Sequence, residues 1–272
     1  METVTLTITK QPDLCLEADC ISPDAFAETT GEIADLPVYV GREQHRLGDF
    51  FEISGRAGTT PAGTMIVVKG DLSRVKYIGM KMTAGEVVID GNADMYVGAW
   101  MQGGKITVNG DVDAFAGTGM KGGELCINGN AGNYLGSAYR GDWRGMTGGK
   151  IVVTGDAGSD LGTFMNGGEI IVGGNVDVHV ATHAEGGTII IKGDAKSRLG
   201  GQMVEGEIYV FGDIDVMMPG FAYRKDVDLE VDGAKGRFAL YEGDLGERHR
   251  KRKGQMIYGK LYQLDQALIL FF

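Results

Sequence analysis

The stretch "MKGGELCINGNAGNYLGSAYRGDWRGMTGGKIVVTGDAGSDLGTFMNGGEIIVGGN", Met120 to Asn175, contains the phrase M-x-G-G-x-I-x-V-x-G three times, with conservative replacements. The glycine that closes each phrase recurs along most of the chain and serves as an anchor. The anchors are Gly70, Gly91, Gly110, Gly129, Gly155, Gly174, Gly193 and Gly212. They follow one another at 21, 19, 19, 26, 19, 19 and 19 residues, and a fixed period near 20 is typical of repeat architectures.

The residues around each anchor alternate in the way that strands do. From the second anchor on, the positions two and four before it hold only β-branched residues or leucine, and the positions two and six after it are apolar as well. Seven after it, most repeats carry a glycine, which suits a corner that needs a positive φ. These corner residues are Gly98, Gly117, Gly136, Gly162 and Gly200. The pattern predicts an all-β fold, a right-handed parallel β-helix in which about eight coils of 19 residues form a solenoid.

The period fails at both ends of the chain. Residues 1–65 contain "VTLTITK", expected as a strand, "SPDAFAETTGEIADL", expected as a helix or capped loop, and "LGDFFEISG", expected as a strand. Solenoids need caps over their open ends. We therefore expect a cap in residues 1–65, β-helix repeats in 66–215, and a C-terminal cap and partner-docking tail in 216–272.

Composition excludes several classes of protein. The net charge of -11 argues against general nucleic-acid binding, which depends on Lys and Arg. No apolar run reaches the roughly 18 residues of a membrane span, and the first ten residues do not resemble a signal peptide, so we expect a cytoplasmic protein. The three cysteines Cys15, Cys20 and Cys126 predict neither a disulfide framework nor an iron-sulfur site.

One column that faces away from the predicted core is mostly apolar. It stands three residues before each anchor and comprises Val88, Thr107, Cys126, Val152, Ile171, Ile190 and Tyr209. Such a stripe needs cover, either from a permanent protein partner or from the chain's own terminal segments. The alternative is a β-rich face that tolerates exposed β-branched residues. We expect Val152, Ile171, Ile190 and Tyr209 to take part in partner docking.

The interval of 26 residues is 19 plus the seven residues "YRGDWRG". This insert gathers two guanidinium groups and two aromatic rings on one loop, and Trp, Tyr and Arg are enriched at interface hot spots. We favour a partner-docking loop over contact with an anionic substrate or simple decoration. The docking candidates are Tyr139, Arg140, Asp142, Trp143 and Arg144.

The chain ends on the apolar run Leu268 to Phe272, which we expect to dock on the repeats or on a neighbour. Before it, the basic run from Arg248 to Lys253 is either a solvated loop or a contact for an acidic partner or anionic ligand.

The only close histidine pair is His179 and His183, with Glu185 nearby. An H-x-x-x-H spacing places two imidazoles on one face only in a helix, and here it falls on a β-coil. A metal site is therefore less favoured than a local partner contact or drift of the repeat. No G-x-S-x-G motif or P-loop occurs. We assign no catalytic, cofactor-binding or metal-binding residue.

Several of these motifs together resemble a known family. The stretches "LGDFFEISG", "KYIGMKMTAGEVVIDGNADMYVGAWMQGGKI" and "GNYLGSAYRGDWRGMTGGKI" resemble the C subunit of formylmethanofuran dehydrogenase from methanogenic archaea, along nearly the whole chain. The glycine pattern alone also resembles the C-terminal β-helix domain of the glutamate synthase large subunit. The N-terminal segment and the insert favour the first family.

The resemblance implies a scaffold subunit, without a catalytic centre of its own, in the complex that reversibly reduces CO2 and fixes it as formylmethanofuran. It also implies a tungsten or molybdenum pterin, iron-sulfur clusters and a dinuclear metal site on partner subunits, with contact between this chain and methanofuran left open. The alternative is a scaffold in a formyltransferase/hydrolase complex or a glutamate-synthase-like amidotransferase complex.

Overall fold

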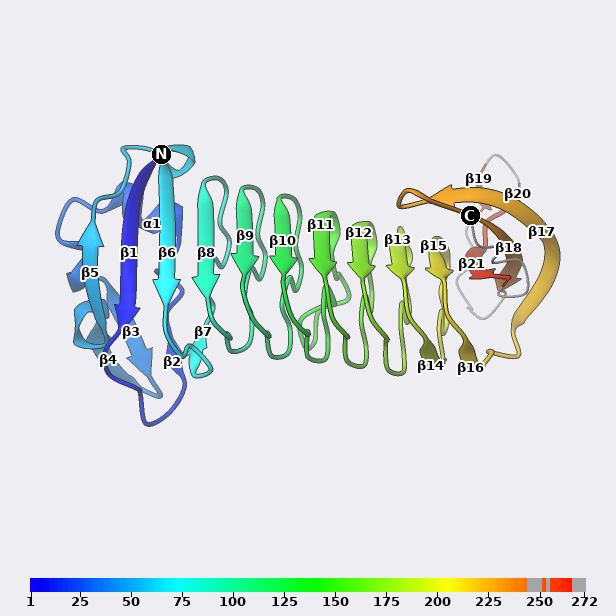
Figure 1. Ribbon diagram of the computed structural model, residues 1–272, viewed down its shortest axis with the longest axis horizontal. Helices are drawn as coiled ribbons and strands as arrows, with labels where there is room; N and C mark the ends of the chain where they lie inside the picture. Colours follow the sequence, from blue (N-terminus) through cyan, green and yellow to red (C-terminus); the bar gives the residue numbers. More distant parts are fainter. Residues whose placement is uncertain (244–250, 253–254, 266–272) are drawn as a thin grey trace.

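The protein is almost entirely built from β-strands. The computed structural model describes residues 1–243, 251–252 and 255–265. Figure 1 shows an elongated molecule in which most strands stand side by side in chain order. The described part contains one short α-helix, and no described helix is long and apolar enough to cross a membrane. The all-β prediction is confirmed.

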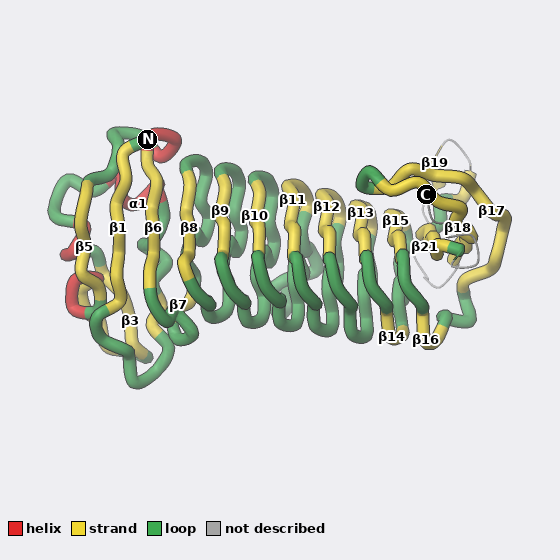
Figure 2. Tube along the Cα trace, viewed as in Figure 1, coloured by secondary structure: helices red, strands yellow, loops and turns green. Residues whose placement is uncertain are grey.

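The repeats form the centre of a 13-stranded sheet, in which each strand pairs in parallel with the strand of the next repeat. These strands are β6 (Thr64–Lys69), β8 (Glu86–Asp90), β9 (Lys105–Val108), β10 (Glu124–Ile127), β11 (Thr147–Val153), β12 (Asn166–Val172), β13 (Glu185–Ile191) and β15 (Glu205–Val210). Between strands, the chain crosses behind the sheet as loops and returns (Figure 2). On that return path, parallel bridges join Leu72, Ala93, Val112, Ala131, Ala157, Val176 and Ala195 in order.

The sheet is extended at each end by one further parallel strand and then by antiparallel strands. At the N-terminal end, β1 (Glu2–Ile8) pairs in parallel with β6 and antiparallel with β5 (Phe51–Gly55). At the other end, β21 (Gly259–Leu264) pairs in parallel with β15, and the hairpin of β17 (Phe221–Val231) and β18 (Ala234–Gly243) follows antiparallel.

The remaining elements are short. They are the strands β2 (Leu16–Glu17), β3 (Pro37–Val40), β4 (Glu43–Arg46), β7 (Val75–Lys76), β14 (Ala195–Ser197), β16 (Ile214–Val216), β19 (Lys251–Arg252) and β20 (Gln255–Met256), the helix α1 (Pro23–Glu28), and the 3-10 turns η1 (Ile33–Asp35), η2 (Leu47–Asp49) and η3 (Pro61–Gly63).

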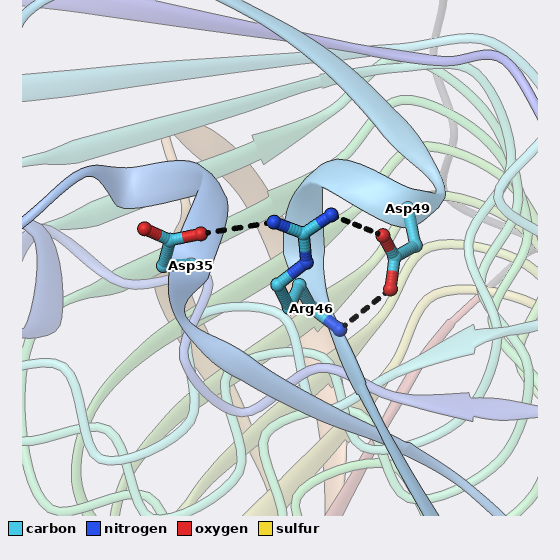
Figure 3. A network of polar contacts seen from close by, with 3 residues as sticks. All are labelled: Asp35, Arg46 and Asp49. Atoms are coloured by element: carbon cyan, nitrogen blue, oxygen red, sulfur yellow. Dashed lines mark hydrogen bonds and ion pairs between the residues drawn. The ribbon is translucent and has the colours of Figure 1, made fainter.

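Strands lie where "VTLTITK" and "LGDFFEISG" predicted them, in β1 and β5, and the segment expected as a helix or capped loop contains α1. Helix α1 begins where the Ser22 hydroxyl accepts a hydrogen bond from the Ala25 N–H (3.2 Å) and Pro23 follows at the first helical position. Arg46 then bridges η1 and η2, because its guanidinium lies 3.3 Å from Asp35 Oδ1 and 3.1 Å from Asp49 Oδ1 (Figure 3). The Arg46 backbone N–H also donates to Asp49, and this is the main reason why the pKa of that carboxyl lies below its usual value.

Stacked like residues form the core, as the columns predicted. Leu125 lies against Ile151, and Ile151 against Ile170, in neighbouring strands. All three side chains are 0% exposed, and fully burying an aliphatic side chain contributes about 1.5 to 3 kcal/mol. The seven extra residues before β11 do not shift this register, because Ile127 still lies against Val153.

An exposed column of alternating Asn and Asp reinforces the stack one residue after each anchor. In each step a side-chain oxygen accepts the backbone N–H of the same column in the next repeat, at 2.6 to 2.9 Å. The column runs Asn92, Asp111, Asn130, Asp156, Asn175, Asp194 and Asp213. Alternation with neutral Asn separates most of the like charges, which would repel at adjacent positions.

The predicted corner glycines have the predicted backbone conformation, with φ between 63° and 65°. Gly117 is a clear example, because a Cβ at this position would also overlap Cδ1 of the buried Ile151. Gly141 has a positive φ of 82° as well, but a Cβ there would have no neighbour within 4 Å. An alanine at Gly141 would therefore suffer only backbone strain, whereas an alanine at Gly117 would suffer both strain and crowding.

We therefore predict that Gly117→Ala lowers the free energy of unfolding more than Gly141→Ala. Strain alone costs about 1 to 2 kcal/mol, and crowding in a packed core adds about 1 to 3 kcal/mol. Urea denaturation of both variants measures the difference. Equal losses would show that the corner is set by φ alone.

Candidate functional site

The insert is a loop whose two ends are held close together on the next repeat. Before it, the Ala138 N–H donates to the Thr163 carbonyl (3.0 Å), and after it the Gly145 N–H donates to the adjacent Phe164 carbonyl (2.8 Å). The residues between these bonds leave the stack and return to the same place. The loop is thus an outward projection that leaves the repeats undisturbed.

The loop is shaped by its own aspartate. Asp142 donates its N–H to the Tyr139 carbonyl (2.9 Å), and its Oδ1 accepts the N–H groups of Trp143 (2.7 Å) and Arg144 (3.2 Å). This Asx turn leaves Trp143 56% exposed. Of the five predicted docking residues in the loop, Asp142 therefore has a structural role, and the other four are exposed.

Beneath the loop runs a column of stacked aromatic rings that the repeat pattern alone did not reveal. Tyr77, Tyr96, Phe115 and Tyr134 stack with ring centroids 4.8, 5.0 and 4.6 Å apart and nearly parallel planes. The last three stand five residues after successive anchors, and all four have positive φ. The sequence does show an aromatic residue at the same position of successive repeats. It does not show that these rings stack, because the stacking depends on the positive φ of each residue.

Two loop residues fold back onto this column. The Tyr139 ring lies 6.0 Å from Tyr96 and 5.5 Å from Trp100, and the Arg140 guanidinium lies 5.8 Å from the centroid of the Phe115 ring. Burial is the main reason why the pKa of Tyr77, at the far end of the column, rises to about 12. Loop and column form one surface, here called the aromatic platform (Tyr77, Tyr96, Trp100, Phe115, Tyr134 and Tyr139).

The predicted apolar stripe faces out of the sheet, and its N-terminal half is not covered within the described chain. Val88, Thr107, Cys126 and Val152 are each half-buried. Beside them runs a row of alternating charge, in which Lys105 pairs with Glu124 (3.4 Å). A second pair, Lys150 and Glu169, is 2.8 Å apart. Docking on Val152 remains a prediction.

The C-terminal half of the stripe is covered by the protein itself, which corrects part of the docking prediction. Ile171 and Ile190 are 6% and 3% exposed, because the β17–β18 hairpin folds back from the end of the row toward β13 (Figure 1). The hairpin and β21 place Val231, Phe238, Leu240 and Tyr262 against them.

Two further contacts fix the hairpin. Asp232 in its turn pairs with Lys192 (3.1 Å), and the Phe238 ring of β18 meets Tyr209 edge-on with ring centroids 6.2 Å apart. Ile171 and Ile190 are therefore inaccessible to another protein in this arrangement, and Tyr209 is half-buried. Coverage by a terminal segment, the alternative raised from the sequence, accounts for them.

The two histidines of the H-x-x-x-H spacing have separate partners. His179 lies between Asp160 (Nδ1 to Oδ1, 3.8 Å) and Arg198 (Nε2 to Nη1, 3.0 Å) in the neighbouring repeats. Because arginine only donates, Nε2 accepts and the imidazole proton sits on Nδ1, facing Asp160. His183 stacks on Phe164 at 4.8 Å. Among residues 1–243, 251–252 and 255–265, no three His, Cys, Asp or Glu side chains form a group that could hold a metal ion.

Two predicted contact segments lie outside the described residues. The apolar run Leu268 to Phe272 is one of them. Of the basic run from Arg248 to Lys253, only the backbone of Lys251 and Arg252 is described, in β19.

Comparison with known proteins gives consistent relatives. No family model matches the sequence. The chain is 46% identical over 96 residues to the C subunit of a tungsten-containing formylmethanofuran dehydrogenase of Methanothermobacter wolfeii. It is 45% identical over 96 residues to the C subunit of the molybdenum-containing enzyme of Methanosarcina barkeri. A third relative, the C subunit of the tungsten-containing enzyme of Methanococcus maripaludis, is 53% identical over 133 residues.

The chain resembles the C subunit of formylmethanofuran dehydrogenase. The match covers 35% of this chain and 36% of the Methanothermobacter wolfeii protein, so it spans about a third of that relative's length. For the Methanococcus maripaludis protein, the match covers 48% of each chain. The resemblance inferred from the sequence motifs is thus confirmed, over about a third to a half of the chain and not over nearly its whole length.

A solved structure shares the fold along nearly the whole length of this chain. A chain of the formyltransferase/hydrolase complex of Methylorubrum extorquens, solved in complex with methylofuran, matches with a TM-score of 0.79 and 24% identity. The match covers 96% of this chain and 100% of that chain. At this identity the likeness concerns the fold.

We predict that Phe238→Ala loosens the β17–β18 hairpin and uncovers the C-terminal half of the stripe. Phe238 is 0% exposed, and truncating such a ring costs about 3 to 5 kcal/mol. Protease cleavage within β17 and β18 should rise together with loss of unfolding free energy. Val216→Ala, at a residue 61% exposed, is the control and should change stability by less than about 0.5 kcal/mol. A hairpin that stays resistant in Phe238→Ala would contradict this packing.

A further prediction concerns the thiol on the uncovered stripe. Burial raises the pKa of Cys126 to about 11, and Glu124, whose Oε1 accepts from Sγ at 3.0 Å, adds to the shift. Between about pH 9 and 11 the Cys126 thiol is therefore protonated in the folded chain and ionised in the unfolded chain. As the pH rises through this range, the contribution of this thiol to the free energy of unfolding is lost.

Iodoacetamide alkylation of Cys126, followed by peptide mapping, should rise with a midpoint near pH 11 in the folded chain and near pH 9 in urea. Glu124→Gln should lower the folded midpoint only part of the way, because burial is the larger cause. A folded midpoint near 9 would show that the thiol is open to water.

Proposed function

We propose that this chain is a structural subunit, without a catalytic centre of its own, of a formylmethanofuran dehydrogenase complex. That complex would reversibly reduce CO2 and fix it as formylmethanofuran, and would work in the cytoplasm. The proposal extends to the whole chain what the names of its partial relatives say of those proteins.

The observation that carries the proposal is the outward stripe. Its C-terminal half is covered by the chain's own hairpin, and the same apolar column continues without a cover from Val152 to Val88 among the described residues. A half-covered apolar face is typical of a protein whose remaining surface meets another protein. The exposed Tyr139 and Trp143 on the insert support a second contact with a partner.

We further propose that the repeats wind as a right-handed parallel β-helix. The in-order parallel strands and the second row of parallel bridges support this form, and crossover connections between parallel strands are almost always right-handed. Residues 1–65 would cap the first coil and residues 216–272 the last, with the repeats in 66–215. The metal pterin, the iron-sulfur clusters and the dinuclear site would belong to partner subunits.

A second candidate is a scaffold in a formyltransferase/hydrolase complex. The solved chain that matches 96% of this one comes from such a complex, which favours this alternative over an amidotransferase. The two candidates differ in redox chemistry, because only the dehydrogenase would need tungsten or molybdenum.

Purification of the tagged chain from its native cells, with metal analysis of whatever accompanies it, tests the proposal. We expect companion proteins that carry tungsten or molybdenum in constant ratio to this chain. Companions without either metal would favour the formyltransferase/hydrolase alternative. A stable monomer with no companions would refute both.

A further inference from the structure

The aromatic platform is confined to the N-terminal half of the repeats and ends at the insert. In the same column, the next three repeats carry Asp160, His179 and Arg198 in place of aromatic rings. The insert projects from the stack of repeats at this boundary, and its Tyr139 and Arg140 side chains contact the rings. The loop and the rings are therefore one built surface, and the loop is its edge.

The stacked rings of the platform cover one another's faces. Tyr96 and Phe115 each lie between two neighbours, with interplanar angles of 14° or less on both sides. Trp143, on the loop beside the platform, is 56% exposed and has the Arg144 guanidinium 4.3 Å from its ring centroid. A flat ligand such as a nucleobase, which needs a free ring face, would find few of them here.

The two arginines of the loop are held by rings and not by carboxylates. The Arg140 guanidinium lies 5.8 Å from the centroid of Phe115, whose two faces are covered by Tyr96 and Tyr134. The Arg144 guanidinium lies 4.3 Å from the centroid of Trp143. Both arginines are exposed. In the part of the chain that the structure describes, neither guanidinium lies within ion-pair distance of a carboxylate. The nearest acidic residue in sequence, Asp142, uses Oδ1 to accept two backbone N–H groups.

A guanidinium that lies by a ring and not by a carboxylate keeps the N–H groups along its edge free to donate. Such an edge matches a carboxylate with two parallel hydrogen bonds, a geometry that lysine cannot provide. The chain as a whole has a net charge of -11, so two arginines on one loop without a carboxylate partner among the described residues stand out as a local positive site. Complementary charge of this kind selects and orients an acidic partner.

We infer that the loop and the aromatic platform bind an acidic segment of a partner subunit, one in which aromatic side chains are interleaved with Glu or Asp. The carboxylates would pair with Arg140 and Arg144, and the aromatic side chains would pack on Trp143 and Tyr139. This inference rests on the proposed function, since it names the chemistry of the partner. A nucleic acid is disfavoured, because Tyr96 and Phe115 in the stacked column have no free ring face and the two arginines would neutralise few phosphates.

The test uses the full-length chain and a fluorescein-labelled peptide, Glu-Glu-Phe repeated four times, with fluorescence anisotropy as the measurement. We expect Arg140→Glu with Arg144→Glu to weaken binding by about tenfold or more, and Trp143→Ser to weaken it by a similar factor. All three residues are exposed, so these variants should fold. A twin peptide with Gln in place of Glu should bind at least about tenfold more weakly.

The matched control is Arg42→Glu with Lys225→Glu, which changes the net charge equally at exposed positions away from the platform. It should leave the dissociation constant within about twofold, as expected for surface changes outside a hot spot. The inference is overturned if the control weakens binding as much as the loop variant does, if the Gln peptide binds equally well, or if a dT10 oligonucleotide binds more tightly than the acidic peptide.

Failure of this inference can be told apart from failure of the proposed function. If the peptide does not respond to the loop variants while the native chain still purifies with its metal-bearing companions, the platform assignment falls and the structural role stands. If the native chain has no companions, the proposed function falls whatever the peptide does.

Discussion

The structure depends on stacking each repeat in register on the next. A strand that buries only one side chain in two cannot form a core alone, so each repeat is stabilised by its neighbours. Ile151 therefore lies between Leu125 and Ile170, and the small residues Ala131 and Ala157 meet on the return path. Hydrogen bonds from the Asn and Asp column lock the same register at the surface.

Because register is fixed in two rows, the stack tolerates additions that leave it at one place and return. The seven-residue insert does this between Ala138 and Gly145, whose N–H groups donate to adjacent carbonyls of the next repeat. A regular core thus carries an irregular, exposed loop without strain on the strands. Solenoid-like arrays commonly place their recognition residues in such insertions.

The same regularity leaves an outer face that must be covered. The hairpin β17–β18 covers its C-terminal half and buries Ile171 and Ile190, with Phe238 at the centre of the contact. The first part of the face, flanked by alternating Lys and Glu, has no such cover within the described chain. The outer surface is therefore divided into a part that the hairpin covers and a part that the described chain leaves uncovered.

The sequence alone predicted the repeat length, the strand positions, the inward columns and the corner glycines. Each of these is a local pattern that recurs in most repeats. The resemblance to the C subunit of formylmethanofuran dehydrogenase was also readable there, and the relatives confirm it. Three features could not be read in this way. The hairpin falls after the period ends, the aromatic column depends on a positive φ at Tyr96 and Phe115, and the separate partners of His179 and His183 depend on neighbouring repeats.

The sequence alone was enough to establish which core side chains stack, because residues at the same position of successive repeats lie a constant number of residues apart and alternate with outward-facing ones. What covers Ile171 and Ile190, and which rings lie near Arg140, became visible only in the folded molecule. Those contacts join segments that share no period, and their geometry follows from how the hairpin and the insert fold back onto the completed stack.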